Sequence, residues 1–233
     1  MILAILQARM SSSRLPGKVM RAVIGRPMIA RQIERVQRSR RIDRLIVATS
    51  TDPSDDPLVK FLAGEGVAVF RGSLSDVLSR FAAAATAFGP AKHVIRLTAD
   101  CPLVDWEVID ACVDLHLRGG FDYTSNAIER TFPDGLDVEV MTIAALLRAD
   151  QGAIEPPQRE HVTPFIVRND GLFRHGHLVQ TTRWEDLRWT VDTEADLALV
   201  QRIYELLYSA KPDFRSADIL ALQAKLPEVI THR

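Results

Sequence analysis

The sequence predicts an α/β fold with a mostly parallel central sheet, and three observations support that prediction. Short apolar runs of strand length alternate with helical patterns through the first half of the chain. Several of these runs are apolar throughout, which is typical of strands buried on both faces of a parallel sheet. Hydrophobic residues make up 47% of the 233, enough for one continuous core. We therefore expect a single domain over residues 1–233.

Strands and helices alternate regularly up to about residue 120. The predicted strands are residues 1–6, 45–49, 67–70 and 92–97. The predicted helices are residues 27–40, 57–64, 74–88 and 106–118. Pro27 suits a first helical turn, and Gly119-Gly120 is suited to closing the last of these helices. Repeated strand–helix units of this kind favour helices on both faces of the sheet.

The second half is less regular, and we interpret it as an antiparallel excursion at about residues 121–182 followed by a return to the sheet. The predicted strands are residues 123–126, 136–141, 173–180 and 187–191. The predicted helices are residues 143–149, 159–167, 193–208 and 216–225. A turn at Pro133-Asp134-Gly135 separates the first two of these strands.

Charge and composition exclude several classes of protein. The 29 basic and 30 acidic residues nearly cancel, which argues against a protein devoted to nucleic acid, although a nucleotide needs only a local basic pocket. Cys101 and Cys112 form no CxxC pair, so neither a disulfide framework nor structural zinc is expected. No segment approaches the roughly 20 apolar residues of a membrane span, and the N-terminal run lacks a basic flank. We expect a soluble, cytoplasmic protein that binds neither nucleic acid nor membrane.

The loop after the first strand, residues 7–18, is the most informative segment. It contains the cations Arg9, Arg14 and Lys18, three consecutive serines, and Gly17, whose missing side chain lets backbone approach a ligand. Guanidinium groups and a lysine suit phosphate oxygens, and serine hydroxyls with backbone N–H groups complete an anion site. The segment matches neither the P-loop nor the GxGxxG pattern. From composition alone, a solvated basic turn stays open as the alternative.

Asp100 and Asp192 each follow a predicted strand. In open α/β sheets, ligands bind beyond the carboxyl ends of the strands, so both side chains would face one crevice. One or two carboxylates together with substrate phosphates are typical ligands of Mg²⁺. Each residue also has a structural alternative, because Asp192 could cap the helix beginning at Thr193 and Asp100 could be a turn residue.

Residues 7–20 closely resemble the first motif of the CMP-sugar synthetases. The A-R-x-x-S-x-R-L-P-G-K segment of CMP-Kdo synthetases is matched without a gap by Ala8, Arg9, Ser12, Arg14, Leu15, Pro16, Gly17 and Lys18. The resemblance implies that this loop wraps a nucleoside triphosphate, with nucleotide contacts from Ala8, Arg9, Ser13, Arg14 and Lys18. Asp100 and Asp192 resemble metal-binding aspartates of the same family, in its G-D-x-P and D-T-x-x-D-L segments, which implies a Mg²⁺ site.

Most of the chain, from about residue 2 to about residue 205, resembles one branch of these enzymes, the spore coat polysaccharide biosynthesis protein F family. The matching segments are residues 70–73, 76–80, 96–103, 133–140, 159–164 and 188–193. The resemblance implies a three-layer αβα, GT-A-like nucleotide-diphospho-sugar transferase fold and a role in making an activated sugar for a surface polysaccharide. It further implies that Gly72, Ser73 and Arg80 lie near the base and ribose. Relatives commonly pair, so a homodimer is expected.

Two later segments are candidates for contact with the acceptor sugar. Asp137 and Glu139 lie two apart on an extended segment, so they share one face. They could hold sugar hydroxyls or a second metal, or they could form a solvent-facing acidic edge. Arg159 and His161 could bind a sugar carboxylate, or they could belong to a salt-bridged surface. We assign all four residues to substrate binding, with these alternatives open.

The sequence departs from CMP-Kdo synthetases at two informative positions. Thr98-Ala99-Asp100 stands where those enzymes have Q-G-D, and Gln7 stands where they have proline. The glutamine of Q-G-D lies near the nucleobase in that family. The resemblance therefore implies triphosphate chemistry, and it leaves the identities of the base and of the sugar open.

Taken together, these resemblances imply a Mg²⁺-dependent nucleotidyltransferase of the cytidylyltransferase type. A sugar hydroxyl would attack the α-phosphate of CTP and release pyrophosphate, with Arg9, Lys18 and Asp100 as the catalytic residues. A glycosyltransferase of the same fold and a non-catalytic nucleotide-binding protein are the alternatives. The glycosyltransferase would usually carry a D-x-D metal motif, which the segment from Asp134 to Asp137 does not fit.

Overall fold

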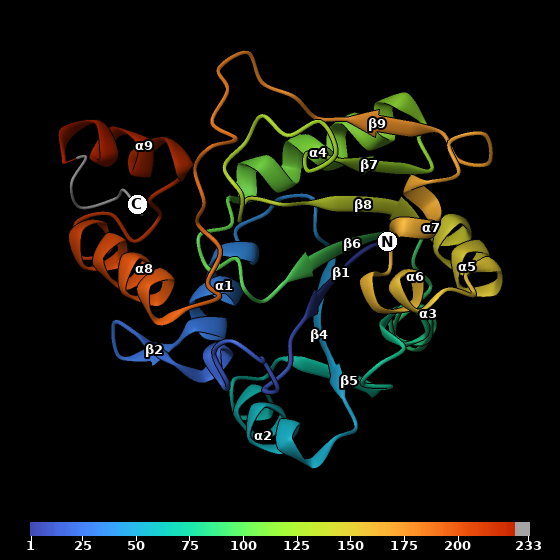
Figure 1. The fold of residues 1–233 in the computed structure, drawn as a ribbon, viewed down its shortest axis with the longest axis horizontal. Coiled ribbons are helices and arrows are strands. Elements are labelled where there is room, and N and C mark those ends of the chain that lie inside the picture. The colour runs from blue at the N-terminus through green and yellow to red at the C-terminus, as the bar shows by residue number, and fades with distance from the viewer. Residues whose placement is uncertain (227–233) are drawn as a thin grey trace.

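Seven strands form one mixed sheet in the computed structural model, which describes residues 1–226 (Figure 1). The strands are β1 (Ile2–Gln7), β4 (Arg44–Ser50), β5 (Ala68–Gly72), β6 (His93–Thr98), β7 (Tyr123–Ser125), β8 (Glu139–Thr142) and β9 (His175–His177), in the spatial order β5-β4-β1-β6-β8-β7-β9. The first four are parallel to one another. β8 runs antiparallel to both β6 and β7, and β9 is parallel to β7.

Helices cover both faces of this sheet. They are α1 (Met28–Val36), α2 (Asp56–Gly64), α3 (Val77–Ala87), α4 (Trp106–Gly119), α5 (Ile143–Gly152), α6 (Pro156–His161), α7 (Pro164–Val167), α8 (Glu194–Leu207) and α9 (Ser216–Lys225). The prediction of a mostly parallel sheet flanked by helices is confirmed. None of the helices within the described part of the chain has the length and apolar character needed to cross a membrane.

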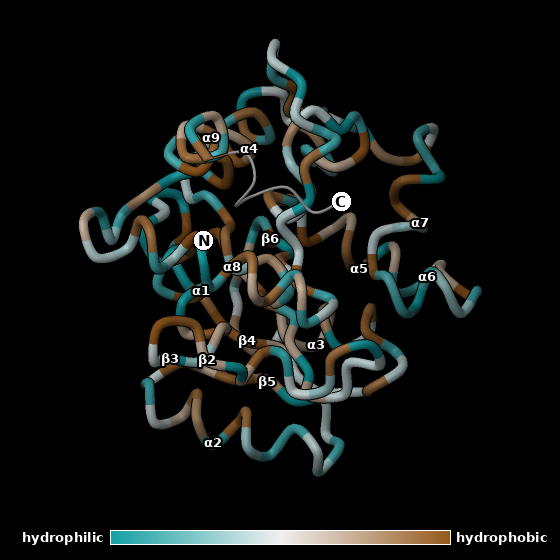
Figure 2. Tube along the Cα trace, turned by 60° about the vertical axis from the view of Figure 1, so that its left-hand side comes forward, coloured by the Kyte–Doolittle hydropathy of each residue, from teal (hydrophilic) through white to brown (hydrophobic). Residues whose placement is uncertain are grey.

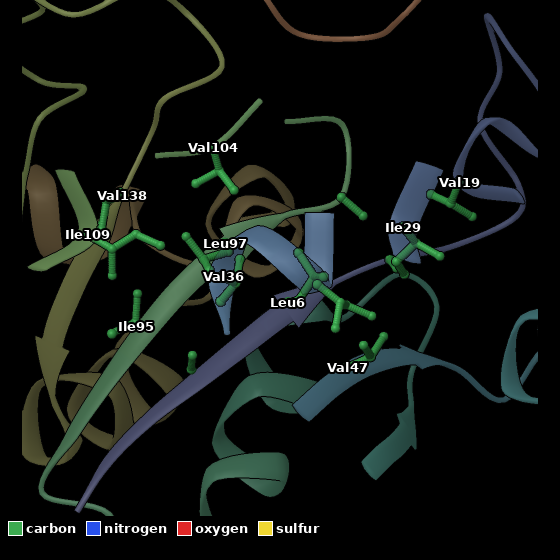
Figure 3. Close-up of a cluster of buried hydrophobic side chains, with 14 of the residues drawn as sticks. Leu6, Val19, Ile29, Val36, Val47, Ile95, Leu97, Val104, Ile109 and Val138 are labelled. Carbon is green, nitrogen blue, oxygen red and sulfur yellow. The ribbon is translucent and has the colours of Figure 1, made fainter. Parts of the chain in front are cut away.

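Successive side chains of a strand point to opposite faces of the sheet, and this alternation divides the core into two layers. On β1, Ala4 and Leu6 face a cluster that includes residues of α1, α2 and α4, whereas Leu3 and Ile5 face a cluster built with α3 and α5. Figure 3 shows part of the first cluster, with labelled side chains from both the sheet and its helices. Hydrophobic residues concentrate in central strands such as β4, and hydrophilic residues prevail along the peripheral helix α6 (Figure 2).

A third apolar cluster joins the two ends of the chain. It packs Leu15 of the first loop and Val23 against Trp189, Val191 and residues of α8 and α9. The loop itself carries a 3₁₀ turn at Lys18–Met20 and a small hairpin of β2 (Ala22–Val23) and β3 (Arg26–Pro27), which the sequence did not predict. This packing brings the loop after β1 next to the segment before α8.

The second half differs from its prediction in four places. The predicted strand at 187–191 is wrong, because the segment buries Trp189 and Val191 in the third cluster and makes only an isolated bridge, Asp134 to Arg188, within the described residues. The predicted helix at 159–167 is two short helices, α6 and α7, separated at Val162, which has a φ of 72°. Pro164 lacks the N–H needed to continue a helical ladder. The strands predicted at 136–141 and 173–180 are shorter, β8 and β9.

Candidate active site

A hollow of about 340 Å³ lies beyond the carboxyl ends of β1 and β6. Its walls come from the first loop, the end of β6, the segment before α8 and the end of α6. The lining residues are Gln7, Ala8, Arg9, Ser12, Ser13, Arg14, Lys18, Val19, Arg96, Thr98, Ala99, Asp100, His161 and Asp192. The structure therefore brings together eight of the residues that the sequence singled out: Ala8, Arg9, Ser13, Arg14, Lys18, Asp100, His161 and Asp192. This is the edge at which open α/β sheets bind ligands.

The first loop is folded back on itself by its own backbone. The carbonyl of Met10 accepts hydrogen bonds from the N–H groups of Ser12 at 2.9 Å and Gly17 at 2.8 Å. Gly17 adopts a φ of 70°, which glycine reaches without the steric cost of a side chain. Buried Leu15 anchors the middle of the loop in the third apolar cluster. The loop therefore keeps its cations at fixed places around the hollow.

Lys18 connects the first loop to both aspartates. Its Nζ donates to the carbonyl of Val191 at 2.7 Å and to Oδ1 of Asp192 at 3.0 Å, and it lies 3.8 Å from Oδ2 of Asp100. Oδ2 of Asp192 also pairs with Arg14 and Arg188, each at 2.9 Å. Burial alone would raise the pKa of Asp192, but the hydrogen bond and charge of Lys18, followed by Arg188 and Arg14, hold it below its usual value.

Asp192 is not the cap of α8, so this structural alternative is wrong. Thr193 is the N-cap residue, and its side chain accepts from the N–H of Asp196 at 3.2 Å. The carboxylate of Asp196 in turn accepts from the N–H groups of Asp192 at 2.8 Å and Thr193 at 2.7 Å. The side chain of Asp192 is thereby left facing the hollow. The N–H of Val191 donates to the carbonyl of Asp100 at 2.8 Å, which joins the two aspartate segments.

Asp55 is a site residue that sequence reasoning missed. Its fully buried carboxylate accepts from the N–H of Met10 at 2.7 Å, from the hydroxyl of Thr49 at 2.8 Å, and from the N–H and hydroxyl of Ser50. Burial would raise the pKa of Asp55, but these hydrogen bonds lower it below its ordinary value. Asp55 thus fastens the first loop to the end of β4, directly after Arg9. Nothing in the local sequence distinguishes it from Asp52 and Asp56.

Gly72, Ser73 and Arg80 lie together beside the first loop, outside the lining of the hollow. A Cβ atom on Gly72 would lie 2.9 Å from Cγ of Arg80, so only glycine leaves room for this arginine. Arg80 is 1% exposed and donates from Nη1 to the carbonyl of Ser73 at 2.7 Å, while its Nε and Nη2 have no partner within the described part of the chain. Burial lowers the pKa of Arg80 to about 10. Their contact with a base or ribose stays a prediction.

A second hollow adjoins the first. It is lined by Arg96, Thr98, Ala127, Asp137 and Glu139, so the two predicted acids do share one face. Glu139 pairs with Arg96 and accepts from the hydroxyl of Tyr123 at 2.6 Å. Burial would raise the pKa of Glu139, but the charge of Arg96 and hydrogen bonds from Tyr123 hold it below its ordinary value.

Asp137 occupies the rim of this second hollow. Its two oxygens accept from Nη1 and Nη2 of Arg130 at 2.7 and 2.9 Å. Arg130 also lies 3.5 Å from Asp134. The alternative of a solvent-facing acidic edge does not describe Glu139, which is 9% exposed, and Asp137 is half-buried.

The structure separates Arg159 from His161. The guanidinium of Arg159 binds both oxygens of Asp76 at 3.0 and 2.7 Å and Asp150 at 2.7 Å, and the residue does not line the hollow. For Arg159 the salt-bridged alternative describes the geometry, and the assignment to a sugar carboxylate is not supported. His161 does line the hollow.

A strained turn presents His161 to the hollow. The N–H of Thr163 donates to the carbonyl of His161 at 2.8 Å, and Val162 between them has φ 72° and ψ −56°. These values describe a γ-turn of the rare, strained kind. Val162 is β-branched and fully buried, so the surrounding packing holds it in this conformation.

The acidic groups of the first hollow fit a cation that also binds substrate. Within residues 1–226, no three His, Cys, Asp or Glu side chains converge on one point as a complete metal site would require. Asp100 and Asp192 instead present two carboxylates to a basic, open hollow. Hard oxygen donors in this number suit Mg²⁺, which usually takes its other ligands from phosphates and water.

A basic loop after the first strand, Asp100 just beyond β6 and Asp192 just before α8 line one hollow of a mostly parallel sheet, and together they define the class of nucleotidyltransferases. The sequence profile of the family described as Cytidylyltransferase matches residues 3–211. The chain therefore belongs to the cytidylyltransferase family.

Individual relatives agree with this membership. Spore coat polysaccharide biosynthesis protein SpsF of Bacillus subtilis is 34% identical over 100% of this chain and 98% of its own length. An uncharacterized protein of Methanocaldococcus jannaschii is 38% identical over 88% of this chain and 85% of its own length. A 3-deoxy-manno-octulosonate cytidylyltransferase of Anaeromyxobacter dehalogenans is 36% identical over 48% of this chain and 46% of its own length.

Solved structures match the whole fold. A cytidylyltransferase from Leptospira borgpetersenii superposes with a TM-score of 0.94 at 29% identity, covering 100% of this chain and 97% of that one. A CMP:2-keto-3-deoxy-manno-octonic acid synthetase complexed with CTP superposes with a TM-score of 0.68 at 17% identity, covering 88% and 98%. The second likeness concerns the fold alone. The resemblance to the SpsF family and to the CMP-Kdo enzymes, first seen in the motifs, is confirmed.

Proposed function

We propose that this chain transfers the CMP group of CTP to a hydroxyl of a sugar or sugar acid, releases pyrophosphate, and so supplies an activated sugar for a surface polysaccharide. One observation carries the proposal: Arg9, Arg14 and Lys18 line a single hollow together with Asp100 and Asp192. Family membership supports cytidylyl transfer, and the names of SpsF and of the CMP-Kdo enzymes support the acceptor class.

In this proposal the first loop holds the triphosphate. Arg9, Lys18 and the hydroxyl of Ser13 contact phosphate oxygens, and the guanidinium and ammonium charges offset the negative charge that develops on the leaving pyrophosphate. Asp55 keeps the backbone of this loop in place through Met10. Rate acceleration then comes largely from fixed position and fixed charge.

The transfer is a single displacement at phosphorus. The acceptor oxygen forms a bond to the α-phosphorus, and the bond between that phosphorus and the α,β-bridging oxygen breaks. Pyrophosphate leaves with the electron pair, and the hydroxyl proton passes to solvent. Asp100 and Asp192 would hold Mg²⁺, which supplies charge neutralisation at the phosphates and lowers the pKa of the attacking hydroxyl.

Lys18 has two sets of partners in this scheme. Its ammonium pairs with Asp192 and lies near Asp100. Incoming phosphate oxygens would compete with these carboxylates for the ammonium, and a divalent cation held by the aspartates would supply the neutralising charge that the ammonium gives up. Nucleotide and metal are therefore expected to bind with positive cooperativity.

Pyrophosphate release tests the proposal. The assay uses each of the four ribonucleoside triphosphates with Mg²⁺ and a panel of sugar acids, neutral sugars and polyols. We expect release with CTP and at least one acceptor, and its loss in Lys18→Ala. Triphosphate binding by calorimetry without release from any pair would favour a non-catalytic nucleotide-binding protein. Absence of triphosphate binding would contradict the proposed function.

A further inference from the structure

We propose that the second hollow, lined by Arg96, Thr98, Ala127, Asp137 and Glu139, is the acceptor subsite, and that it selects a neutral, hydroxyl-rich acceptor. The substrate class is a sugar or polyol that carries no carboxylate or phosphate group. This inference rests on the proposed cytidylyl transfer and narrows its acceptor.

Position is the first argument. Arg96 and Thr98 of β6 line both hollows, so the second adjoins the first. Thr98 is separated from Asp100 by one residue, at the carboxyl end of the same strand. β8 lies beside β6 and places Glu139 directly opposite Arg96 in the antiparallel register (Figure 1). A molecule held in the second hollow, against these two strands, has its hydroxyls next to the proposed site of phosphorus chemistry.

Charge is the second argument. Among the described residues that line the second hollow, Arg96 alone is cationic, and Glu139 already pairs with it. The neighbouring cation, Arg130, is held at both nitrogens by Asp137 and lies near Asp134. The two acids of the lining are thus each paired with one guanidinium group. An anionic acceptor would add negative charge to a wall that has no cation to spare, at a cost that rises with burial.

Hydrogen-bonding capacity is the third argument. An ionised carboxylate has about four acceptor positions, and Arg130 takes two of those on Asp137. The remaining acceptor positions on the two oxygens of Asp137 can accept hydrogen bonds from sugar hydroxyls. Glu139 is held rigidly by Arg96 and Tyr123, and the hydroxyl of Thr98 can donate as well as accept. Hydroxyl groups that both donate and accept satisfy such a wall without bringing a charge.

The position of Arg159 agrees with this inference. Arg159 was one of the two candidates for a sugar carboxylate, with His161, and it is instead bound by Asp76 and Asp150 away from both hollows. Of the cations that line the first hollow, Arg9, Arg14 and Lys18 are assigned to the triphosphate, and Arg96 is paired with Glu139. The acceptor side of the site is left with the two acids, the hydroxyl of Thr98 and one guanidinium group, Arg96, that Glu139 already neutralises.

Matched acceptor pairs test the inference. Pyrophosphate release is measured with CTP, Mg²⁺ and pairs that differ only in charge: glucose and glucuronate, galactose and galacturonate, mannose and mannuronate, and ribitol beside ribonate. We expect kcat/KM for at least one neutral member to exceed that of its acidic counterpart at least tenfold. Release from acidic members alone would overturn the inference and leave the proposed function standing.

A charge-changing variant gives a second readout. Asp137→Asn removes one negative charge and releases part of Arg130, so the ratio of neutral to acidic kcat/KM should fall at least tenfold, while the KM for CTP stays within about twofold. Asp170→Asn, an exposed change before β9, is the matched control and should keep the wild-type ratio.

The remaining outcomes also decide the question. An unchanged ratio in Asp137→Asn overturns the inference. So does a chain that binds CTP by calorimetry yet releases pyrophosphate with no neutral member of the panel. Failure to bind CTP at all removes the proposed function, and the acceptor subsite falls with it.

Discussion

The ammonium of Lys18 lies 3.0 Å from the carboxylate of Asp192, a residue 174 positions further along the chain. Lys18 is 9% exposed and also donates to the carbonyl of Val191. This contact closes the hollow between the first loop and the segment before α8. Removing Lys18 would leave Asp192 with Arg14 and Arg188 as partners. Removing the carboxylate of Asp192 would leave the largely buried ammonium with Asp100, 3.8 Å away, which costs more than the loss of a surface ion pair.

Asp100→Asn is expected to lower turnover about 100-fold or more and to leave the fold intact. Asp100 is about a third exposed, and its nearest cation, Lys18, is 3.8 Å away, so little stability depends on its charge. Its proposed role as a ligand of Mg²⁺ does depend on that charge. Steady-state kinetics with CTP, together with thermal unfolding, would measure the two effects separately.

Asp213→Asn, an exposed change after α8, is the control for that experiment and should match the wild type in both measurements. Near-normal turnover in Asp100→Asn would contradict the assignment of Asp100 as a ligand of Mg²⁺. A large drop in melting temperature would show a structural role instead.

The sequence predicted the parallel half of the fold well because local patterns decide it. β1, β4 and β6 are runs whose residues are buried on both faces, and burial of this kind needs no knowledge of distant partners. The segment 187–191 shows the opposite case. It has the pattern of a strand, yet Trp189 and Val191 are buried by α8 and α9 instead of by a sheet neighbour.

The residues of the candidate site also fall into two groups, those that a local motif reveals and those whose role depends on a distant contact. Arg9, Lys18 and Asp100 belong to contiguous motifs, so the sequence could place them before the fold was seen. Asp55 could not be found, because its importance comes from a hydrogen bond to Met10, 45 residues away. Arg159 was assigned to substrate because the sequence does not show that Asp76, 83 residues distant, binds it.

Asp55→Asn is expected to lower the free energy of unfolding by about 2–4 kcal/mol and to raise the KM for CTP about tenfold. The amide that replaces one oxygen would face donors from Met10, Thr49 or Ser50, which leaves buried hydrogen-bonding groups unsatisfied. The first loop would lose its attachment next to Arg9. Urea unfolding and CTP titration would measure both consequences.

Its neighbour offers a matched control. Asp56 is exposed and pairs with Arg71 on the surface, so Asp56→Asn should cost no more than about 1 kcal/mol and leave the KM for CTP unchanged. Equal effects of the two substitutions would contradict the role given to Asp55.

The pair of half-buried His93 and buried His116 is expected to make stability depend on pH. Nδ1 of His93 lies 3.0 Å from Nε2 of His116, whose Nδ1 contacts the hydroxyl of Thr124 at 3.0 Å. Burial, with His93 as a further cause, lowers the pKa of His116 from 6.5 to about 4, and burial also lowers the pKa of His93. The unfolded chain therefore binds the proton first as the pH falls.

Because the folded pKa of His116 is depressed, the free energy of unfolding should fall from pH 6.5 towards pH 4, by up to about 3 kcal/mol from His116. His116→Gln should remove most of that dependence, and above pH 7.5 it should differ from the wild type by a constant amount. Urea unfolding at a series of pH values measures the slope. An identical slope in the variant would show that His116 does not titrate in this way.

Gly135→Ala is expected to damage both stability and turnover. Gly135 has a φ of 106°, and a Cβ atom there would lie 2.8 Å from the carbonyl carbon of Trp189 and 2.9 Å from the nitrogen of Thr190. The strained conformation alone costs about 1–3 kcal/mol, and the backbone that must shift leads directly into Asp192. Gly171→Ala is the control, since a Cβ atom there meets nothing within 4 Å, and it should change the free energy of unfolding by less than about 0.5 kcal/mol. Calorimetric unfolding and pyrophosphate release on both variants decide the matter: if Gly135→Ala is as stable and active as Gly171→Ala, the close approach of these two segments does not position Asp192.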